Sequence, residues 1–179
     1  MFDREYAQRI AQEDLDRSYS GRLMVSGVEA RELVWIVHYQ TAAFLRSGDP
    51  GQLLAGNGPY LVDRIDGGLH QIGPVSYVTG EWEGDYRQRI RKMPVRTAVD
   101  DLHDEIRQAV AEQGRIMAMH LLRQRVPSLV FAEVVDYVTT LETGSAPEHL
   151  VAIATKALVP PLDPVLMVET IQPGRGSKS

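Results

Sequence analysis

The clearest structural pattern in the chain lies in residues 32–90, which read ELVWIVHYQTAAFLRSGDPGQLLAGNGPYLVDRIDGGLHQIGPVSYVTGEWEGDYRQRI. Within them, residues 33–40 form the clearest predicted strand, because side chains alternate between two faces and both faces begin apolar. A strand of this kind lies inside its sheet and is covered on each side. Residues 60–65 and 69–72 are β-like runs on either side of Asp66-Gly67-Gly68, and this pattern predicts a hairpin.

Helical patterns flank this region. Before it, Phe2, Tyr6 and Ile10 recur at helical spacing after Asp3, which predicts an amphipathic helix capped by that aspartate. A short strand is expected over residues 23–25. At the end of the region apolar side chains return every four residues, which predicts one helix lying on the sheet; these side chains are Val78, Trp82, Tyr86 and Ile90.

After Pro94 the pattern is helical. Apolar stripes predict one helix that ends near Gly114 and another that starts at Pro127-Ser128 and is capped by Gly144. The inner face of the second helix is predicted to carry Val130, Val134, Tyr137 and Leu141. Residues 116–124 between the two helices are apolar almost all round, which predicts a buried helix. Ser145-Ala146-Pro147-Glu148 has the pattern of a capping box that opens a last helix.

These patterns predict an α+β protein, in which a small antiparallel sheet packed with helices is followed by an all-α C-terminal module. The predicted boundaries are residues 1–93 for the α+β domain, 94–171 for the helical module and 172–179 for a polar, disordered tail.

The composition excludes several classes of site and partner. The chain has 179 residues, no cysteine and a formal net charge of −5, so disulfides and cysteine-ligated metals are excluded. Both halves are mildly acidic, whereas nucleic-acid binders carry a basic excess. No run approaches the ~20 apolar residues of a membrane span. Residues 1–10 mix charged and apolar side chains, unlike a signal peptide. We therefore expect a cytoplasmic protein with no nucleic-acid or membrane partner.

Residue patterns of catalysis are scarce. The sequence has no Gly-x-Ser-x-Gly, no phosphate-binding glycine loop and no His-Glu-x-x-His. Asp100, His103 and Asp104 would share one helix face as metal ligands, but an acidic first turn that favours the helix dipole explains them better. His120 is expected in the core. The sequence predicts a protein that is not an enzyme and that holds no metal or cofactor.

Residues 32–90 resemble the YrhB-like family of bacterial toxin-immunity proteins, immunity protein 35. The family pattern is a strand of the type W-V-F-x-Y-Q followed by x-L-x-G-N-x-P-x-x-V-D-[RK]-x-D-G. The matching positions are Trp35, Tyr39, Gln40, Leu54, Gly56, Asn57, Pro59, Val62, Asp63, Arg64, Asp66 and Gly67. The resemblance implies a protein encoded beside a polymorphic toxin, which it binds and neutralises. It does not extend over the helical module.

A second, shorter resemblance lies in that module. Residues 115–123 and 126–141 are similar to the helix–turn–helix of the ribosomal stalk protein's C-terminal domain. Val126-Pro127-Ser128 replaces the usual glycine-rich turn, and the lysine positions are missing. Three roles therefore stay open for the module: extension of the binding surface, formation of a homodimer, or selection of the toxin.

Acidic side chains are the predicted partner-binding residues, because they would complement a basic toxin; they are Asp63, Asp66, Glu81, Glu83 and Asp85. The alternative function is a chaperone-like stress protein that binds unfolded chains. It requires an exposed apolar patch of several hundred Å², and the sequence accounts for most apolar stripes by core packing.

Overall fold

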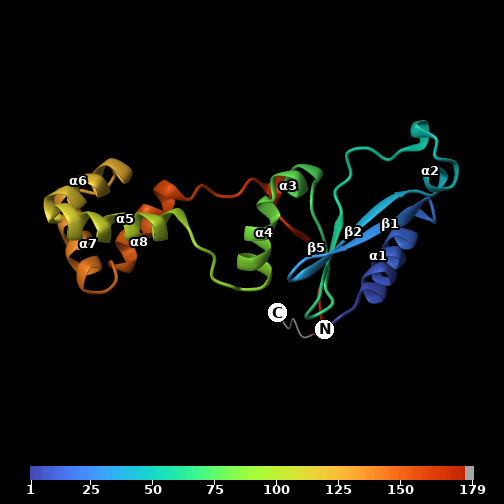
Figure 1. The fold of residues 1–179 in the computed structure, drawn as a ribbon, viewed down its shortest axis with the longest axis horizontal. Coiled ribbons are helices and arrows are strands. Elements are labelled where there is room, and N and C mark those ends of the chain that lie inside the picture. Colours follow the sequence, from blue (N-terminus) through green and yellow to red (C-terminus); the bar gives the residue numbers. More distant parts are fainter. Residues whose placement is uncertain (176–179) are drawn as a thin grey trace. The chain divides into compact units, whose positions relative to one another are not determined.

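The computed structural model describes residues 1–175 and divides the chain into two compact units. The sheet unit comprises Met1–Met93 and residues 162–175, and the helical unit comprises Pro94–Pro161. Each has its own hydrophobic core. An antiparallel sheet packed with helices and a separate group of helices confirm the predicted α+β class (Figure 1).

The sheet unit is built on a sheet whose described strands follow the order β1-β2-β3-β4-β5, each antiparallel to its neighbour. The strands are β1 (Leu23–Ala30), β2 (Val34–Thr41), β3 (Tyr60–Asp63), β4 (Leu69–Gln71) and β5 (Glu169–Gln172). The predicted hairpin is β3–β4, in which Tyr60 faces Gln71 and Val62 faces Leu69. A short helix, α2 (Ala42–Ser47), and a 3₁₀ turn, η1 (Pro50–Gln52), lie in the β2–β3 connection.

Helix α1 (Arg4–Tyr19) covers one face of the sheet. Asp3 caps it as predicted, because its Oδ1 accepts the Tyr6 N–H at 2.8 Å. The buried side chains of α1 pack against the face of β2 that carries Val37 and Tyr39. The opposite face of β2 carries Val34 and Ile36, which pack with the buried rings of Trp82 and Tyr86. β2 is thus covered on both faces, as its two apolar faces predict.

The prediction of a single helix over residues 78–90 is wrong. The structure has α3 (Pro74–Thr79), α4 (Glu81–Asp85) and a π-helical turn, η2 (Tyr86–Ile90). Gly80 separates the first two at a φ of +79°, a left-handed conformation that cannot continue a right-handed helix and that glycine adopts without steric cost. The break leaves Val78 83% exposed.

The C-terminal boundary also differs from the prediction. The sequence pattern places residues 162–171 in the helical module and residue 172 in the tail. In the structure this stretch returns to the sheet unit through a 3₁₀ turn, η3 (Pro164–Leu166), and strand β5. β5 pairs with β4, and Val168 before it is only 2% exposed. Backbone pairing along the β4 edge and burial of this valine hold the segment there. Residues 176–179 of the predicted tail lie outside the described residues.

The helical unit contains the four predicted helices within residues 94–161, all of which the structure describes. They are α5 (Ala98–Gln113), α6 (Arg115–Arg125), α7 (Phe131–Thr143) and α8 (Glu148–Leu158). Their apolar stripes meet in one core, in which Ile106, Leu122, Tyr137, Leu141 and Leu150 are at most 1% exposed.

Three local expectations fail in this unit. Helix α6 is not buried, because only Ala118 and Leu122 of it are, and Ile116 is 78% exposed. His120 is likewise exposed rather than in the core. Helix α8 begins at Glu148 after Pro147 and has no side-chain cap, so the predicted capping box does not form.

Candidate binding surface

Asp63, the first of the predicted partner-binding residues, lies inside the sheet unit. Its side chain is 0% exposed. Oδ1 accepts backbone N–H groups from Ile65 and Asp66, and Oδ2 accepts the Tyr86 hydroxyl and Arg91 Nη1, the latter at 3.2 Å. Burial, followed by the hydrogen bond to this carboxylate, raises the pKa of Tyr86. A carboxylate with four donors and no exposed surface holds the turn and cannot contact a partner directly.

Asp66 lies beside it and serves the same arrangement. Its Oδ2 accepts Arg91 Nη1 at 3.0 Å and its Oδ1 accepts the Gly68 N–H at 2.9 Å. Its backbone oxygen accepts the Arg175 N–H at 2.8 Å. The side chain is 24% exposed. Asp66 therefore joins the β3–β4 turn to the returning C-terminal segment, and only part of it faces outward.

Asp85 forms the centre of a clamp on the same returning segment. Both of its oxygens accept Arg89 nitrogens at 2.7 Å, and Oδ2 also accepts the Val168 N–H at 2.7 Å. Arg89 in turn donates to the Val168 backbone oxygen at 2.5 Å. Burial acts to raise the pKa of Asp85, but the hydrogen bonds from Arg89 and Val168 hold it below its ordinary value. This acid also has an internal partner.

Two further side chains complete the clamp. Ser76 Oγ donates to the Leu166 backbone oxygen at 2.7 Å, and His70 Nδ1 lies 3.0 Å from Thr170 Oγ1. Sequence reasoning missed this role because the partners are about 80 to 100 residues apart in the chain. The run from Val168 to Ile171 is β-like and is followed by Pro173-Gly174, and this signal would have predicted the strand.

Glu81 and Glu83 are the two predicted residues that remain free to meet a partner. Both are exposed on α4, on either side of the buried Trp82. Neither has an ion-pair partner among the described residues. The preceding helix α3 exposes Val75 and Val78, whose exposed fractions are 53% and 83%. The structure therefore separates the acidic set into three internal residues and two surface residues.

Residues that carry the family resemblance also form hydrogen bonds within this chain. Gln40 pairs with the backbone of Leu54 in both directions, accepting its N–H at 2.8 Å and donating to its oxygen at 3.0 Å. Asn57 donates to the Tyr39 backbone oxygen at 3.2 Å. Both amides fasten the long β2–β3 connection to the sheet, so these residues are required by the fold.

Two further motif side chains, Trp35 and Arg64, make contacts at the opposite end of the sheet. Trp35 Nε1 donates to the Phe2 backbone oxygen at 3.0 Å. The Arg64 guanidinium lies over the Trp35 ring, 5.0 Å from its centroid, and donates to the Arg31 backbone oxygen at 2.6 Å. Gly67 adopts a φ of +76° in the β3–β4 turn. These motif residues therefore hold the strands and turns of this sheet together.

An open groove of about 760 Å³ lies beside the Gly56-Asn57-Gly58 turn. Its charged lining residues are Arg89, which is engaged by Asp85, and Glu169. A Cβ at Gly58 would lie 1.8 Å from the Ile72 backbone oxygen, so only glycine fits there. The groove presents a glycine-rich wall and β5, but no paired acid and base.

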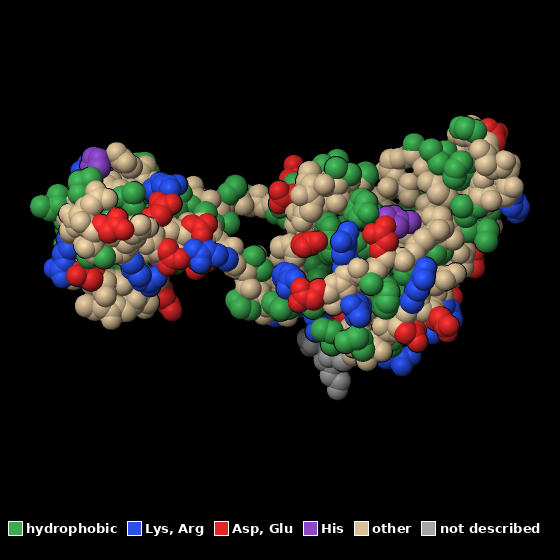
Figure 2. Space-filling model, viewed as in Figure 1, with side chains coloured by type: hydrophobic (Ala, Val, Ile, Leu, Met, Phe, Trp, Pro, Cys, Tyr) green, Lys and Arg blue, Asp and Glu red, His purple; other side chains and the backbone are tan. Residues whose placement is uncertain are grey.

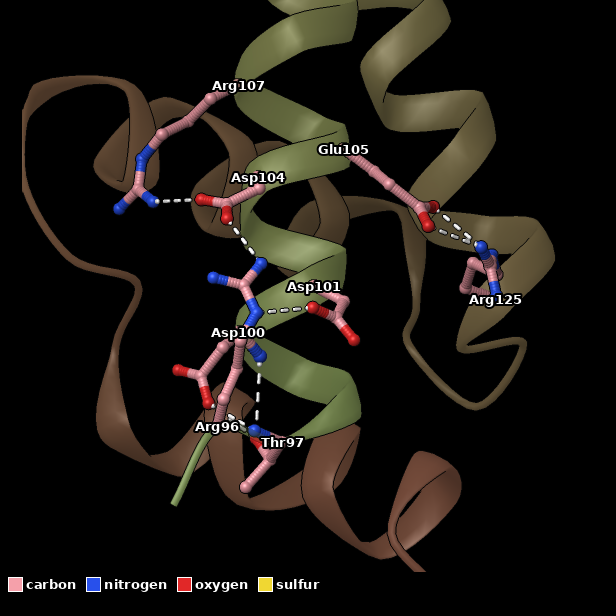
Figure 3. A network of polar contacts seen from close by, with 8 residues as sticks. All are labelled: Arg96, Thr97, Asp100, Asp101, Asp104, Glu105, Arg107 and Arg125. Atoms are coloured by element: carbon pink, nitrogen blue, oxygen red, sulfur yellow. Dashed lines mark hydrogen bonds and ion pairs between the residues drawn. The ribbon is translucent and has the colours of Figure 1, made fainter. Parts of the chain in front are cut away.

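The alternative metal site on α5 does not form. Asp100 accepts the backbone N–H and hydroxyl of Thr97 at 2.7 and 2.8 Å, as a helix cap (Figure 3). Asp104 pairs with Arg96 at 2.6 Å and with Arg107 at 3.4 Å (Figure 3). His103 is turned to Tyr137, with Nε2 2.8 Å from its hydroxyl. Within residues 1–175 no three such side chains are grouped as ligands for a metal ion.

The charge on the visible surface is mixed. Figure 2 shows acidic and basic side chains interspersed over both units, without one extended basic area on this face. Among the described residues, no helix is both long enough and apolar enough to pass through a membrane.

Comparison with known proteins finds one family that is similar to part of the sheet unit. The model of the family immunity protein 35 matches residues 5–88, from α1 to η2. No curated protein and no solved structure matches the chain. The stalk-like resemblance of α6 and α7 therefore remains a prediction, and the helical unit lies outside the family match. Over residues 5–88, this chain is similar to the immunity protein 35 family.

Proposed function

We propose that this protein is a cytoplasmic immunity protein that binds one cognate toxin and neutralises it by protein–protein contact, without catalysis. The family match over the sheet unit carries the proposal. The way in which the family motif is used supports it, because Gln40, Asn57 and Asp63 hold loops and turns rather than a substrate. Binding of this kind buries roughly 1,600 Å² and depends on a few anchor residues.

Within the sheet unit, Glu81 and Glu83 are the proposed contacts with a basic toxin. They are exposed and lack internal cation partners among the described residues, and exposed valines lie on the preceding helix. Charge of opposite sign speeds encounter, and speed matters for an inhibitor that must capture the toxin before it acts. Asp63, Asp66 and Asp85 support this surface from within.

Co-expression with the product of the neighbouring reading frame tests the proposal. We expect a copurifying complex and survival of cells that otherwise die. Continued killing with no complex contradicts it. A complex that forms while the toxin keeps its activity contradicts neutralisation alone.

The surface is tested by reversing charges in matched pairs. Glu81→Lys with Glu83→Lys is expected to lower the association rate about tenfold at low salt, with a smaller loss at high salt. The control changes Glu112 and Asp136 to Lys on the helical unit, with the same change in net charge. Loss of association in the control pair and not in the test pair would move the contact to the helical unit.

The alternative, a chaperone-like stress protein, has one observation in its favour. The helical unit exposes large apolar side chains at the start of α7, where Val130 is 62% and Phe131 68% exposed. Suppression of aggregation of several unrelated proteins, lost in Phe131→Ser, would support it. An immunity protein dedicated to one toxin is expected to suppress none of them.

A further inference from the structure

Strand β1 forms one edge of the sheet, and its outward-facing backbone groups need partners. The Ala42 N–H donates to the Arg22 oxygen at 2.8 Å, so Arg22 points its oxygen toward β2. Because backbone groups alternate along a strand, the Leu23 oxygen and the Val25 N–H then face away from β2. A carbonyl and an N–H two residues apart are the groups that a further antiparallel strand would bind.

The side chain of Gln12 on α1 occupies both groups. Its Nε2 donates to the Leu23 oxygen at 3.2 Å, and its Oε1 accepts the Val25 N–H at 3.0 Å. The second hydrogen of the same amide points to Asp16 Oδ1, 2.9 Å away, which fixes the orientation of the amide. A primary amide carries both a donor and an acceptor, so it can occupy these two groups in place of a neighbouring strand.

A second glutamine of this sheet unit also pairs its side-chain amide with backbone groups. The Gln40 amide pairs in both directions with the backbone of Leu54, at 2.8 and 3.0 Å, and holds that extended residue against the sheet. At Gln40 the amide attaches a segment of the chain. At Gln12 it fills the edge itself.

The rest of β1 is protected by other means. A bulge interrupts its register between Val25 and Gly27. Glu29 follows as an exposed charge, which lies 3.1 Å from His38 and 3.8 Å from Arg31. Bulges and charges both discourage pairing at a sheet edge. The unprotected part would be Leu23 to Val25, which is apolar, and this is the part that Gln12 covers.

We infer that Gln12 prevents the β1 edge from pairing with the β1 edge of a second copy of this chain. Two such edges are complementary under a two-fold axis, because an antiparallel pair of identical strands satisfies the same groups on both copies. The inference concerns self-association and does not depend on the proposed toxin binding.

The test compares the mass of variants in solution by sedimentation over roughly 10 µM to 1 mM, a range that detects association through one short strand. Gln12→Met keeps the aliphatic stem that packs beside β1 but removes the amide. We expect the mass to double relative to the wild-type protein at the upper end of that range. Gln8→Met, an exposed glutamine of the same helix, is the control and should behave as the wild type.

A double variant identifies the surface. Val25→Pro removes the outward N–H at an edge position, where proline is tolerated. Combined with Gln12→Met, it should restore the wild-type mass. A folded Gln12→Met variant whose mass stays equal to the wild type overturns the inference, and so does an increase that persists in the double variant. If another protein rather than a second copy were captured at this edge, the purified variant would also keep the wild-type mass.

Discussion

One unit of the molecule is formed by a single stretch of the chain, and the other is formed by two separate stretches. The helical unit is one uninterrupted stretch, Pro94–Pro161, with a core of its own. The sheet unit is assembled from two stretches, since β5 comes after the helical unit and pairs with β4. The family match ends at residue 88, yet the sheet that it describes is completed about eighty residues later. A match along the sequence can therefore be shorter than the domain that it identifies.

The units also differ in the use of acidic side chains. In the sheet unit Asp63 and Asp85 have side chains that are 0% and 8% exposed, and each accepts several hydrogen bonds. In the helical unit Asp101 and Asp104 are more than half exposed and pair with Arg96 on the surface. Removing a partner from a buried pair is costly, whereas exposed pairs contribute little. Only an exposed acidic residue is a candidate for direct contact with a partner.

The largest effect is expected from ending the chain after Pro161. The sheet unit then loses β5 and the buried Val168. Ser76 and His70 lose their partners in the deleted segment, and Asp85 loses the Val168 N–H but keeps Arg89. We expect the sheet unit to lose at least about 3 kcal/mol of unfolding free energy. Both tryptophans, Trp35 and Trp82, lie in the sheet unit, so urea unfolding followed by their fluorescence measures this unit alone.

Hydrogen exchange of peptides from residues 94–161 is the control for this truncation. Their protection should be unchanged, because the helical unit ends before the deleted strand. Equal loss of protection in both units would mean that they unfold together.

A pair of core truncations is expected to have the next largest effect. Leu61→Ala and Leu150→Ala each remove a side chain that is 0% exposed, the first from the sheet unit and the second from the helical unit. Each should cost roughly 2–5 kcal/mol. Leu61→Ala should shift the fluorescence transition, and Leu150→Ala should change only the exchange of residues 94–161. A shift of both signals by either variant would contradict independent cores.

A smaller effect is expected from neutralising single acids. Asp63→Asn keeps the shape of the side chain but removes the charge that faces Arg91 and replaces one acceptor of the buried turn. We expect a loss of about 2–4 kcal/mol in the fluorescence transition. Asp101→Asn at the exposed Arg96 pair is the matched variant and should leave stability unchanged. Similar losses of unfolding free energy in both variants would contradict the distinction between buried and exposed acids.

The smallest effect concerns pH. Burial lowers the pKa of His70 below its ordinary value of 6.5, so the folded protein favours the neutral ring. Stability from this residue is therefore fully present above pH 6.5 and is lost as the pH falls below that value toward the folded pKa. The urea midpoint of the fluorescence transition should decline between pH 7 and pH 5. His70→Asn should flatten the decline; an unchanged pH profile in this variant would refute the assignment to His70.

Several elements of the fold follow from patterns among neighbouring residues. Alternation along residues 33–40 predicted a strand covered on both faces, Asp3 predicted the start of α1, and apolar stripes predicted the four helices after Pro94. These signals are carried by neighbouring residues, because side-chain periodicity and caps depend on the local backbone. The motif from Trp35 to Gly67 predicted the family in the same way.

Contacts between distant segments set which acids are buried, where the sheet ends and which side-chain amides bind backbone groups. Glu83 and Asp85 are two residues apart and equally acidic in the sequence, yet one is exposed and the other is held by Arg89 and Val168. Gln12 and Gln8 lie on one helix, and only Gln12 reaches the edge of β1. Burial and hydrogen bonding depend on segments that are distant in the chain, and no local pattern contains them.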